Sequence, residues 1–86
     1  MKRYFKSFNS NSNARIHTEF IAYENTKPIK IIYIYSNGER EYIESKECLD
    51  QHLNLERLLD RYACGHTYDG WSLVEISKEE FFIETI

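Results

Sequence analysis

The feature that most constrains the fold is the dipeptide Asn37-Gly38, which lies between two runs rich in β-branched and aromatic residues. Asn-Gly readily takes the positive φ angles of a two-residue type I′ turn and is a strong short-range signal of a β-hairpin. A two-residue loop predicts that Tyr33 lies opposite Tyr42, so that the hairpin over residues 29–45 has one aliphatic face and one tyrosine face. A change of one residue in the loop would rearrange both faces.

The tyrosine face of this hairpin is the first candidate binding surface. It carries three tyrosines edged by an arginine and a glutamate, namely Tyr33, Tyr35, Arg40, Tyr42 and Glu44. Tyrosine and arginine are over-represented at the hot spots of protein interfaces. Aromatic side chains on a sheet also stack on the bases of single-stranded RNA. A terminal segment could instead cover the tyrosines as a second layer.

Three further segments have the residue pattern of strands: Arg3–Phe8, Ala14–Glu24 and Trp71–Ser77. The segment from Ser45 to Gly65 has a helical pattern, with a serine suited to cap its start and a glycine suited to end it. Asn54 could instead cap a second, shorter helix, which would divide the segment in two. The C-terminal residues 79–86 fit either a last edge strand or a helical turn.

The expected element order is β-β-β-β-α-β, in a single domain over residues 1–86. An antiparallel sheet of about five strands with one helix packed across one face places the chain in the α+β class. No apolar run approaches the ~18 residues of a membrane span, and the polar N-terminal residues lack the apolar core of a signal peptide. We therefore expect a cytoplasmic protein with no membrane partner, whose two cysteines are reduced thiols.

Size and charge narrow the function classes. A chain of 86 residues has no room for a separate cofactor domain or for the deep pocket that most enzymes use. Its net charge is −3, and residues 69–86 carry five acids and one lysine. Because phosphate contacts dominate the affinity of nucleic-acid-binding proteins, an acidic chain starts at a disadvantage in that class.

One set of side chains has the composition of a metal site: Cys48, His52, Cys64 and His66. A Cys2His2 set is a known structural zinc site. Along a continuous helix, however, the two cysteines would lie roughly 24 Å apart, and the spacing matches no recognised zinc-finger pattern. We therefore expect neither a metal nor another cofactor, although a sharp break at Asn54 would bring the two pairs closer.

The stretch RYACGHTYDGW, Arg61 to Trp71, is the most reactive-looking part of the chain. The expected position of Cys64 is the last turn of a helix, where the dipole disfavours a thiolate. A pair of histidines, His17 and His66, would need to converge in space for acid–base chemistry. We expect no enzymatic activity, and only His66 and Tyr68 remain as binding candidates in this stretch.

These features together favour a small non-enzymatic protein that binds another macromolecule stoichiometrically. The best interpretation is an inhibitor or regulator that docks on a protein surface, including a surface that normally holds nucleic acid. In size and composition alone, the chain is similar to small regulators and phage-borne inhibitors of host machinery. The alternative is a single-stranded RNA-binding module on the tyrosine face, with a small zinc-binding domain as a distant third. The edge strands and the tyrosines could equally close a homodimer.

Overall fold

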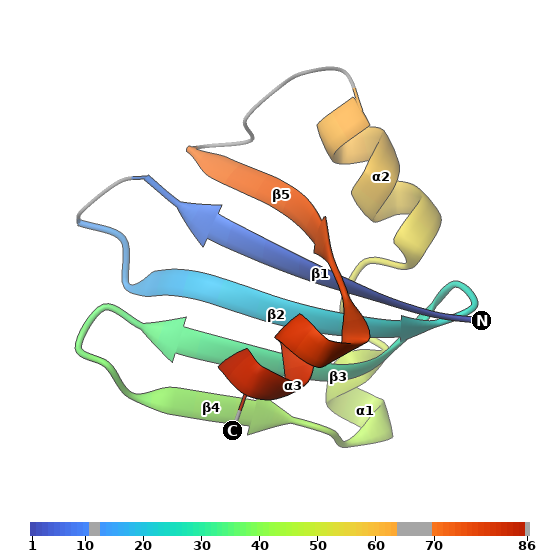
Figure 1. Cartoon of the computed structure of the whole chain (residues 1–86), viewed down its shortest axis with the longest axis horizontal. Coiled ribbons are helices and arrows are strands. Elements are labelled where there is room, and N and C mark those ends of the chain that lie inside the picture. The colour runs from blue at the N-terminus through green and yellow to red at the C-terminus, as the bar shows by residue number, and fades with distance from the viewer. Residues whose placement is uncertain (11–12, 64–69, 86) are drawn as a thin grey trace.

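Five strands form one antiparallel sheet in the order β4-β3-β2-β1-β5 (Figure 1). The computed structural model describes residues 1–10, 13–63 and 70–85. The strands are β1 (Lys2–Asn9), β2 (Ile16–Glu24), β3 (Lys27–Tyr35), β4 (Arg40–Ile43) and β5 (Trp71–Ile76). The helices are α1 (Lys46–Leu49), α2 (Leu55–Ala63) and α3 (Lys78–Glu84). The α+β class and the antiparallel sheet predicted from the sequence are confirmed.

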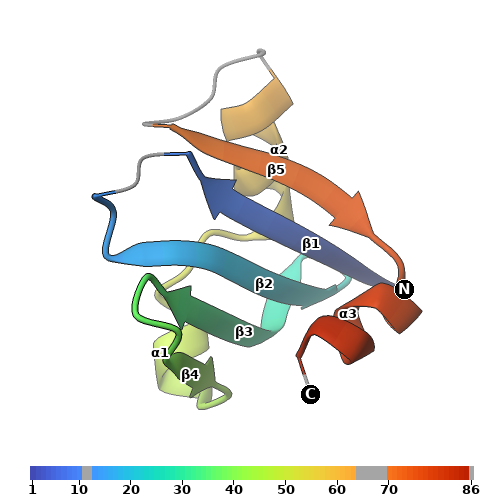
Figure 2. The same cartoon turned by 60° about the vertical axis from the view of Figure 1, so that its left-hand side comes forward.

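Helices cover both faces of the sheet, whereas the sequence predicted one helix on one face (Figures 1 and 2). On the α2 face, α1 and α2 pack over a core formed by Phe5, Ile21, Tyr23, Ile31, Leu49, Leu55 and Leu58. On the opposite α3 face, α3 packs over a second core formed by Tyr4, Phe20, Ala22, Ile32 and Phe81. Residues that alternate along each strand therefore serve two different layers, as a two-sided sheet requires.

The hairpin between β3 and β4 has a three-residue loop, so the predicted pairing is wrong by one residue. The Tyr35 amide donates to the Glu39 carbonyl at 2.9 Å, and the Gly38 amide donates to the Tyr35 carbonyl at 2.9 Å. Within this loop only Gly38 has a positive φ angle, +89°. The Asn37 side chain accepts a hydrogen bond from the Glu39 amide at 2.9 Å. This is a type I turn followed by a left-handed glycine. As a result Tyr42 pairs with Ile32 instead of Tyr33.

The segment predicted as one helix is divided at Asn54, the alternative that the sequence left open. The Asn54 side chain accepts a hydrogen bond from the Arg57 amide at 2.9 Å, and its carbonyl accepts from the Leu58 amide at 3.0 Å. Asparagine in this role satisfies an amide at the start of a helix that has no partner within the helix. The chain between the two helices is also anchored to the sheet, because the Leu55 amide donates to the Thr26 carbonyl at 2.9 Å.

Replacing Asn54 with alanine should lower the free energy of unfolding by about 1 kcal/mol, because the cap of α2 is lost. Urea unfolding followed by circular dichroism measures the change. Asp60→Ala, an exposed substitution in the same helix, serves as the control and should change stability by less than about 0.5 kcal/mol. Equal effects of the two substitutions would contradict the capping role.

The C-terminal segment that the sequence left open is the helix α3. The Ser77 side chain caps it by accepting from the Glu80 amide at 3.0 Å. Phe81, 2% exposed, fixes it to the sheet with its ring centroid 5.0 Å from that of Tyr4 and 6.3 Å from that of Phe20. Among the described residues, no helix is long and apolar enough to cross a membrane.

Candidate functional site

The three predicted binding tyrosines do not form one patch, because the hairpin register places them on opposite faces. Tyr33 pairs with Glu41, next to the pair Ile31–Ile43 on the α2 face. Tyr42 pairs with Ile32, which belongs to the core of the α3 face. The predicted tyrosine face is therefore incorrect, and its members must be considered separately.

The other predicted residues have diverse surroundings. Arg40 on β4 donates to the Glu84 carbonyl on α3 at 2.8 Å, and Glu44 forms an ion pair with Lys30 at 3.4 Å. The central carbon of the Arg15 guanidinium lies 5.5 Å from the centre of the Tyr35 ring. His66 and Tyr68, which were also predicted to bind, lie outside the described residues.

The two halves of the candidate zinc set also have separate settings. Cys48 is exposed on α1. His52 lies against the Tyr33 hydroxyl, which is 3.2 Å from its Nε2 atom. Cys64 and His66 fall outside the described residues. In the ranges 1–10, 13–63 and 70–85, no group of three His, Cys, Asp or Glu side chains converges as a metal site would require.

Exposed apolar side chains gather on the α3 face. Apart from Met1, the exposed large apolar side chains of the described residues have exposed fractions from 36% to 71%: Phe8, Tyr42, Val74, Phe82 and Ile83. Phe82 and Ile83 belong to α3 itself. The strand register places the other three on the same side of the sheet, since each shares the alternation of Tyr4, Phe20 or Ile32. Tyr42 and Val74 lie on the two opposite edge strands of the sheet, so the neighbouring exposed side chains Phe82 and Ile83 of α3 are the candidate centre of an interaction surface on this side.

Charged groups of both signs surround these apolar side chains. Helix α3 carries three exposed glutamates and one lysine: Lys78, Glu79, Glu80 and Glu84. The Lys78 ammonium lies 5.9 Å from the centre of the Phe82 ring, and Lys6 of β1 pairs with Val74 of β5. An apolar centre with a charged edge is the usual composition of a protein interface.

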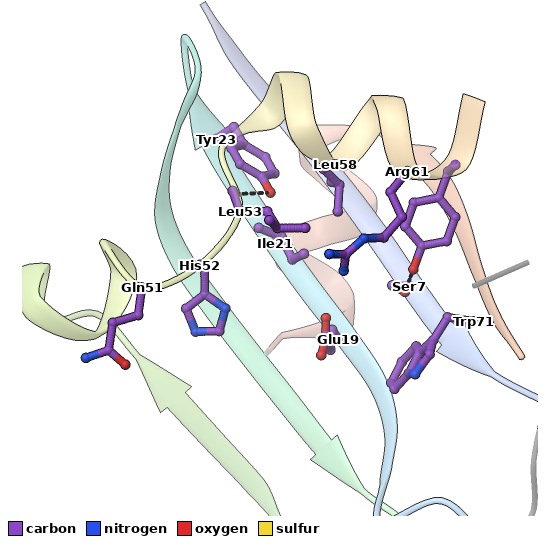
Figure 3. A pocket seen from close by; sticks show the side chains of 11 residues that line it. Ser7, Glu19, Ile21, Tyr23, Gln51, His52, Leu53, Leu58, Arg61 and Trp71 are labelled. Atoms are coloured by element: carbon purple, nitrogen blue, oxygen red, sulfur yellow. Dashed lines mark hydrogen bonds between the residues drawn. The ribbon is translucent and has the colours of Figure 1, made fainter. Parts of the chain in front are cut away.

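A cleft of about 250 Å³ opens on the opposite, α2 face (Figure 3). Its lining is Ser7, Glu19, Ile21, Tyr23, Gln51, His52, Leu53, Leu58, Arg61, Tyr62 and Trp71. Glu19 lies on the central strand, directly between Ser7 of β1 and Tyr33 of β3. Figure 3 shows the Arg61 side chain reaching from α2 toward Glu19. The cleft therefore combines a carboxylate, a guanidinium and aromatic side chains.

The electrostatics of the cleft are set mainly by burial. Removal from water raises the pKa of Glu19 to about 7, although the positive charge of Arg61 limits the rise. Burial, followed by the charge of Glu19, also raises the pKa of Tyr33. Burial lowers the pKa of His52, which favours its neutral form. A carboxyl group that titrates near neutrality within a cleft is typical of a functional site.

Glu19 was not selected from the sequence, although a signal was present. It alternates in phase with Ile21 and Tyr23, both of which are buried on the α2 face. A glutamate at a buried position of a strand carries a desolvation penalty unless it is paired, so its presence there is a signal of a functional site. Phe82 and Ile83 were missed because the type of their element was left open.

Comparison with known proteins gives no indication of the function of this chain. No protein-family model matches the chain, and neither a curated protein nor a solved structure is significantly similar to it. The α3 face and the α2-face cleft lie on opposite sides of the sheet and can serve different ligands.

Proposed function

We propose that this chain is a small non-enzymatic binding protein that acts stoichiometrically, as an inhibitor or regulator docking through its α3 face on a protein. The observation that supports this most is the exposure of Phe82 and Ile83, which are 50% and 71% exposed on α3. Phe82 and Ile83 are the centre of the proposed contact, since α3 presents them beside the sheet. Burying such side chains at an interface provides the main favourable free energy of association.

The partner that fits best is a protein with a basic surface around an apolar depression. The glutamates of α3 lie on the same short helix as Phe82 and Ile83 and would attract a surface rich in lysine and arginine. Proteins that hold nucleic acid carry such surfaces, so an acidic ligand could occupy one and exclude the nucleic acid. A second copy of this chain is a poorer match, because pairing α3 with α3 would bring two sets of glutamates together.

Single-stranded RNA is also a poorer partner than the sequence suggested. The stacking surface expected from Tyr33, Tyr35 and Tyr42 is divided between two faces by the hairpin register. Three glutamates lie on the exposed helix of the α3 face, where they would repel phosphates. RNA and self-association nevertheless make distinct predictions and are outcomes of the same experiment.

The test is affinity capture from the native cells with the tagged wild-type chain, before and after nuclease treatment. The variant F82S/I83S removes the proposed centre of the contact. The control E47S/Q51S changes two exposed side chains in and after α1, on the opposite side. We expect one partner that survives nuclease, is retained by the control and is lost with F82S/I83S.

Three other results would contradict the proposal. Loss of every captured partner after nuclease treatment would favour the RNA-binding interpretation over a protein contact. Capture of the same protein by wild type and F82S/I83S would exclude the α3 face as the contact. A wild-type dimer in light scattering that F82S/I83S converts to a monomer would assign this face to self-association.

A further inference from the structure

The cleft on the α2 face has the size of a site for one small ring system. Its volume is about 250 Å³, and a cavity of about 150 Å³ already holds benzene. Ile21 and Leu58 provide apolar walls, and the Trp71 indole lies to one side of Glu19 (Figure 3). Apolar and aromatic walls with a few convergent polar groups are typical of small-molecule sites.

The polar groups of the cleft make only long hydrogen-bond contacts with neighbouring polar groups. The Ser7 and Tyr62 hydroxyls are 3.4 Å apart, and the nearer nitrogen of His52 is 3.2 Å from the hydroxyl of Tyr33, which lies outside the lining. Good hydrogen bonds between such groups are several tenths of an ångström shorter. The Glu19 carboxylate is desolvated by its burial and lies within the electrostatic influence of Arg61. A ligand could therefore improve several contacts at once.

The pairing of Glu19 with Arg61 selects the chemistry of that ligand. A carboxylate accepts two adjacent N–H groups, and a guanidinium has five N–H donors, so it can serve a carbonyl oxygen besides its other contacts. The edge of guanine carries these groups in a row, as O6, N1–H and the 2-amino group. Adenine and cytosine offer no such row. Flat bases also stack on aromatic side chains such as Trp71.

We infer that the α2-face cleft is a binding site for a guanine base, held by Glu19 at its N–H edge, by Arg61 at O6 and by Trp71 against its ring. The base would come from a free guanine nucleotide or from an unpaired guanosine in RNA. The site lies on the opposite face from α3, so it is independent of the proposed protein contact. Its failure would leave the proposed function untouched.

The charge state of Glu19 makes the binding depend on pH. The titratable or charged groups that face it are Arg61 and Tyr62 from α2, Tyr33 from β3, Tyr23 from its own strand and His52 between the helices. The pKa of Glu19 is about 7, and only its ionised form accepts two N–H groups. Guanosine should therefore bind more tightly at pH 8 than at pH 6.

The experiment is calorimetric titration of the whole chain with guanosine and guanosine monophosphate, with adenosine as the base control. We expect saturable one-to-one binding with a Kd of about 100 µM or tighter for guanosine. Inosine, which lacks the 2-amino group, should bind more weakly. E19Q should weaken guanosine binding about 10- to 100-fold, whereas E24Q, an exposed glutamate at the end of the same strand, should leave it unchanged.

Each outcome has a defined meaning. Equal binding of guanosine and adenosine, no saturation up to about 1 mM, or unchanged binding by a folded E19Q would overturn the guanine site. To identify the source of the base, we compare the affinity of a short oligoadenosine that contains one guanosine with the affinity of guanosine monophosphate. If the oligonucleotide binds more tightly than guanosine monophosphate and its binding depends on the guanosine, the natural ligand is RNA. If it binds equally or more weakly, the natural ligand is the free nucleotide. Both results support the guanine site.

Discussion

Replacing Glu19 with glutamine should raise the free energy of unfolding at pH 8 by roughly 2–3 kcal/mol. The reason is the burial that raises the pKa of this carboxyl from its ordinary value of 4.5 to about 7. At pH 8 the wild type must hold an ionised carboxylate in the cleft, whereas glutamine of the same size has no charge to desolvate. The substitution therefore removes a destabilising group without leaving a cavity.

The direction of the pH dependence follows from the raised pKa. The folded state binds the Glu19 proton more tightly than the unfolded state, so this group lowers stability as pH rises from about 4.5 to 7. At pH 5 the two proteins should consequently differ by less than about 1 kcal/mol. His52 acts in the opposite direction, because its lowered pKa means that protonation at acidic pH opposes folding. Comparing wild type with E19Q at each pH cancels that contribution.

Urea unfolding at pH 5 and pH 8 measures both differences. E24Q is the matched control and should stay within about 0.5 kcal/mol of the wild type at both values. If E19Q is less stable than the wild type at pH 8, the attraction between Glu19 and Arg61 outweighs the desolvation, and the electrostatic account of the cleft is wrong.

Replacing Phe81 with alanine should lower the free energy of unfolding by about 3–4 kcal/mol, whereas Phe82→Ala should lower it by less than about 1 kcal/mol. The two phenylalanines are adjacent in α3 but differ in burial, with exposed fractions of 2% and 50%. Phe81 fills the space between Tyr4 and Phe20, so its removal leaves a cavity in the core of the α3 face. The Phe82 ring faces solvent and contacts Phe81 and Lys78.

Denaturant unfolding of the two variants under the same conditions separates structure from binding. The expected difference between the two variants would show that Phe81 belongs to the core, whereas Phe82 is not needed for the fold and is available to the proposed partner. Similar losses of stability in both variants would mean that Phe82 also supports the fold, and its use as a binding probe would then be compromised. A small effect of Phe81→Ala would show that α3 is not fixed to the sheet as described.

The sequence predicted the class of fold because its strand and turn signals are local. The Asn37-Gly38 hairpin, the alternation of β2 and the capping serine at position 45 all describe short-range preferences that the structure retains. The placement of β1 between β2 and β5 depends on contacts between residues far apart in the chain, such as the ion pair of Arg3 with Glu75 at 2.7 Å. No local pattern contains that information.

The predicted tyrosine face was wrong because one loop residue decides which side each residue faces. Asn-Gly fits a two-residue turn with two positive φ angles, and it also fits a three-residue loop in which only the glycine is left-handed. The structure has the second form, which moves Tyr42 to the α3 face. Helix α3 was ambiguous because seven residues are too few for periodicity to separate a helix from a strand.

The most direct test of the proposed function is a calorimetric titration of the purified partner with the wild-type chain and with F82S/I83S. We expect one-to-one binding by the wild type and at least about 100-fold weaker binding by the variant, since two central apolar contacts are lost. E47S/Q51S should bind like the wild type. Equal affinity of F82S/I83S and wild type would mean that this protein does not bind its partner through the α3 face.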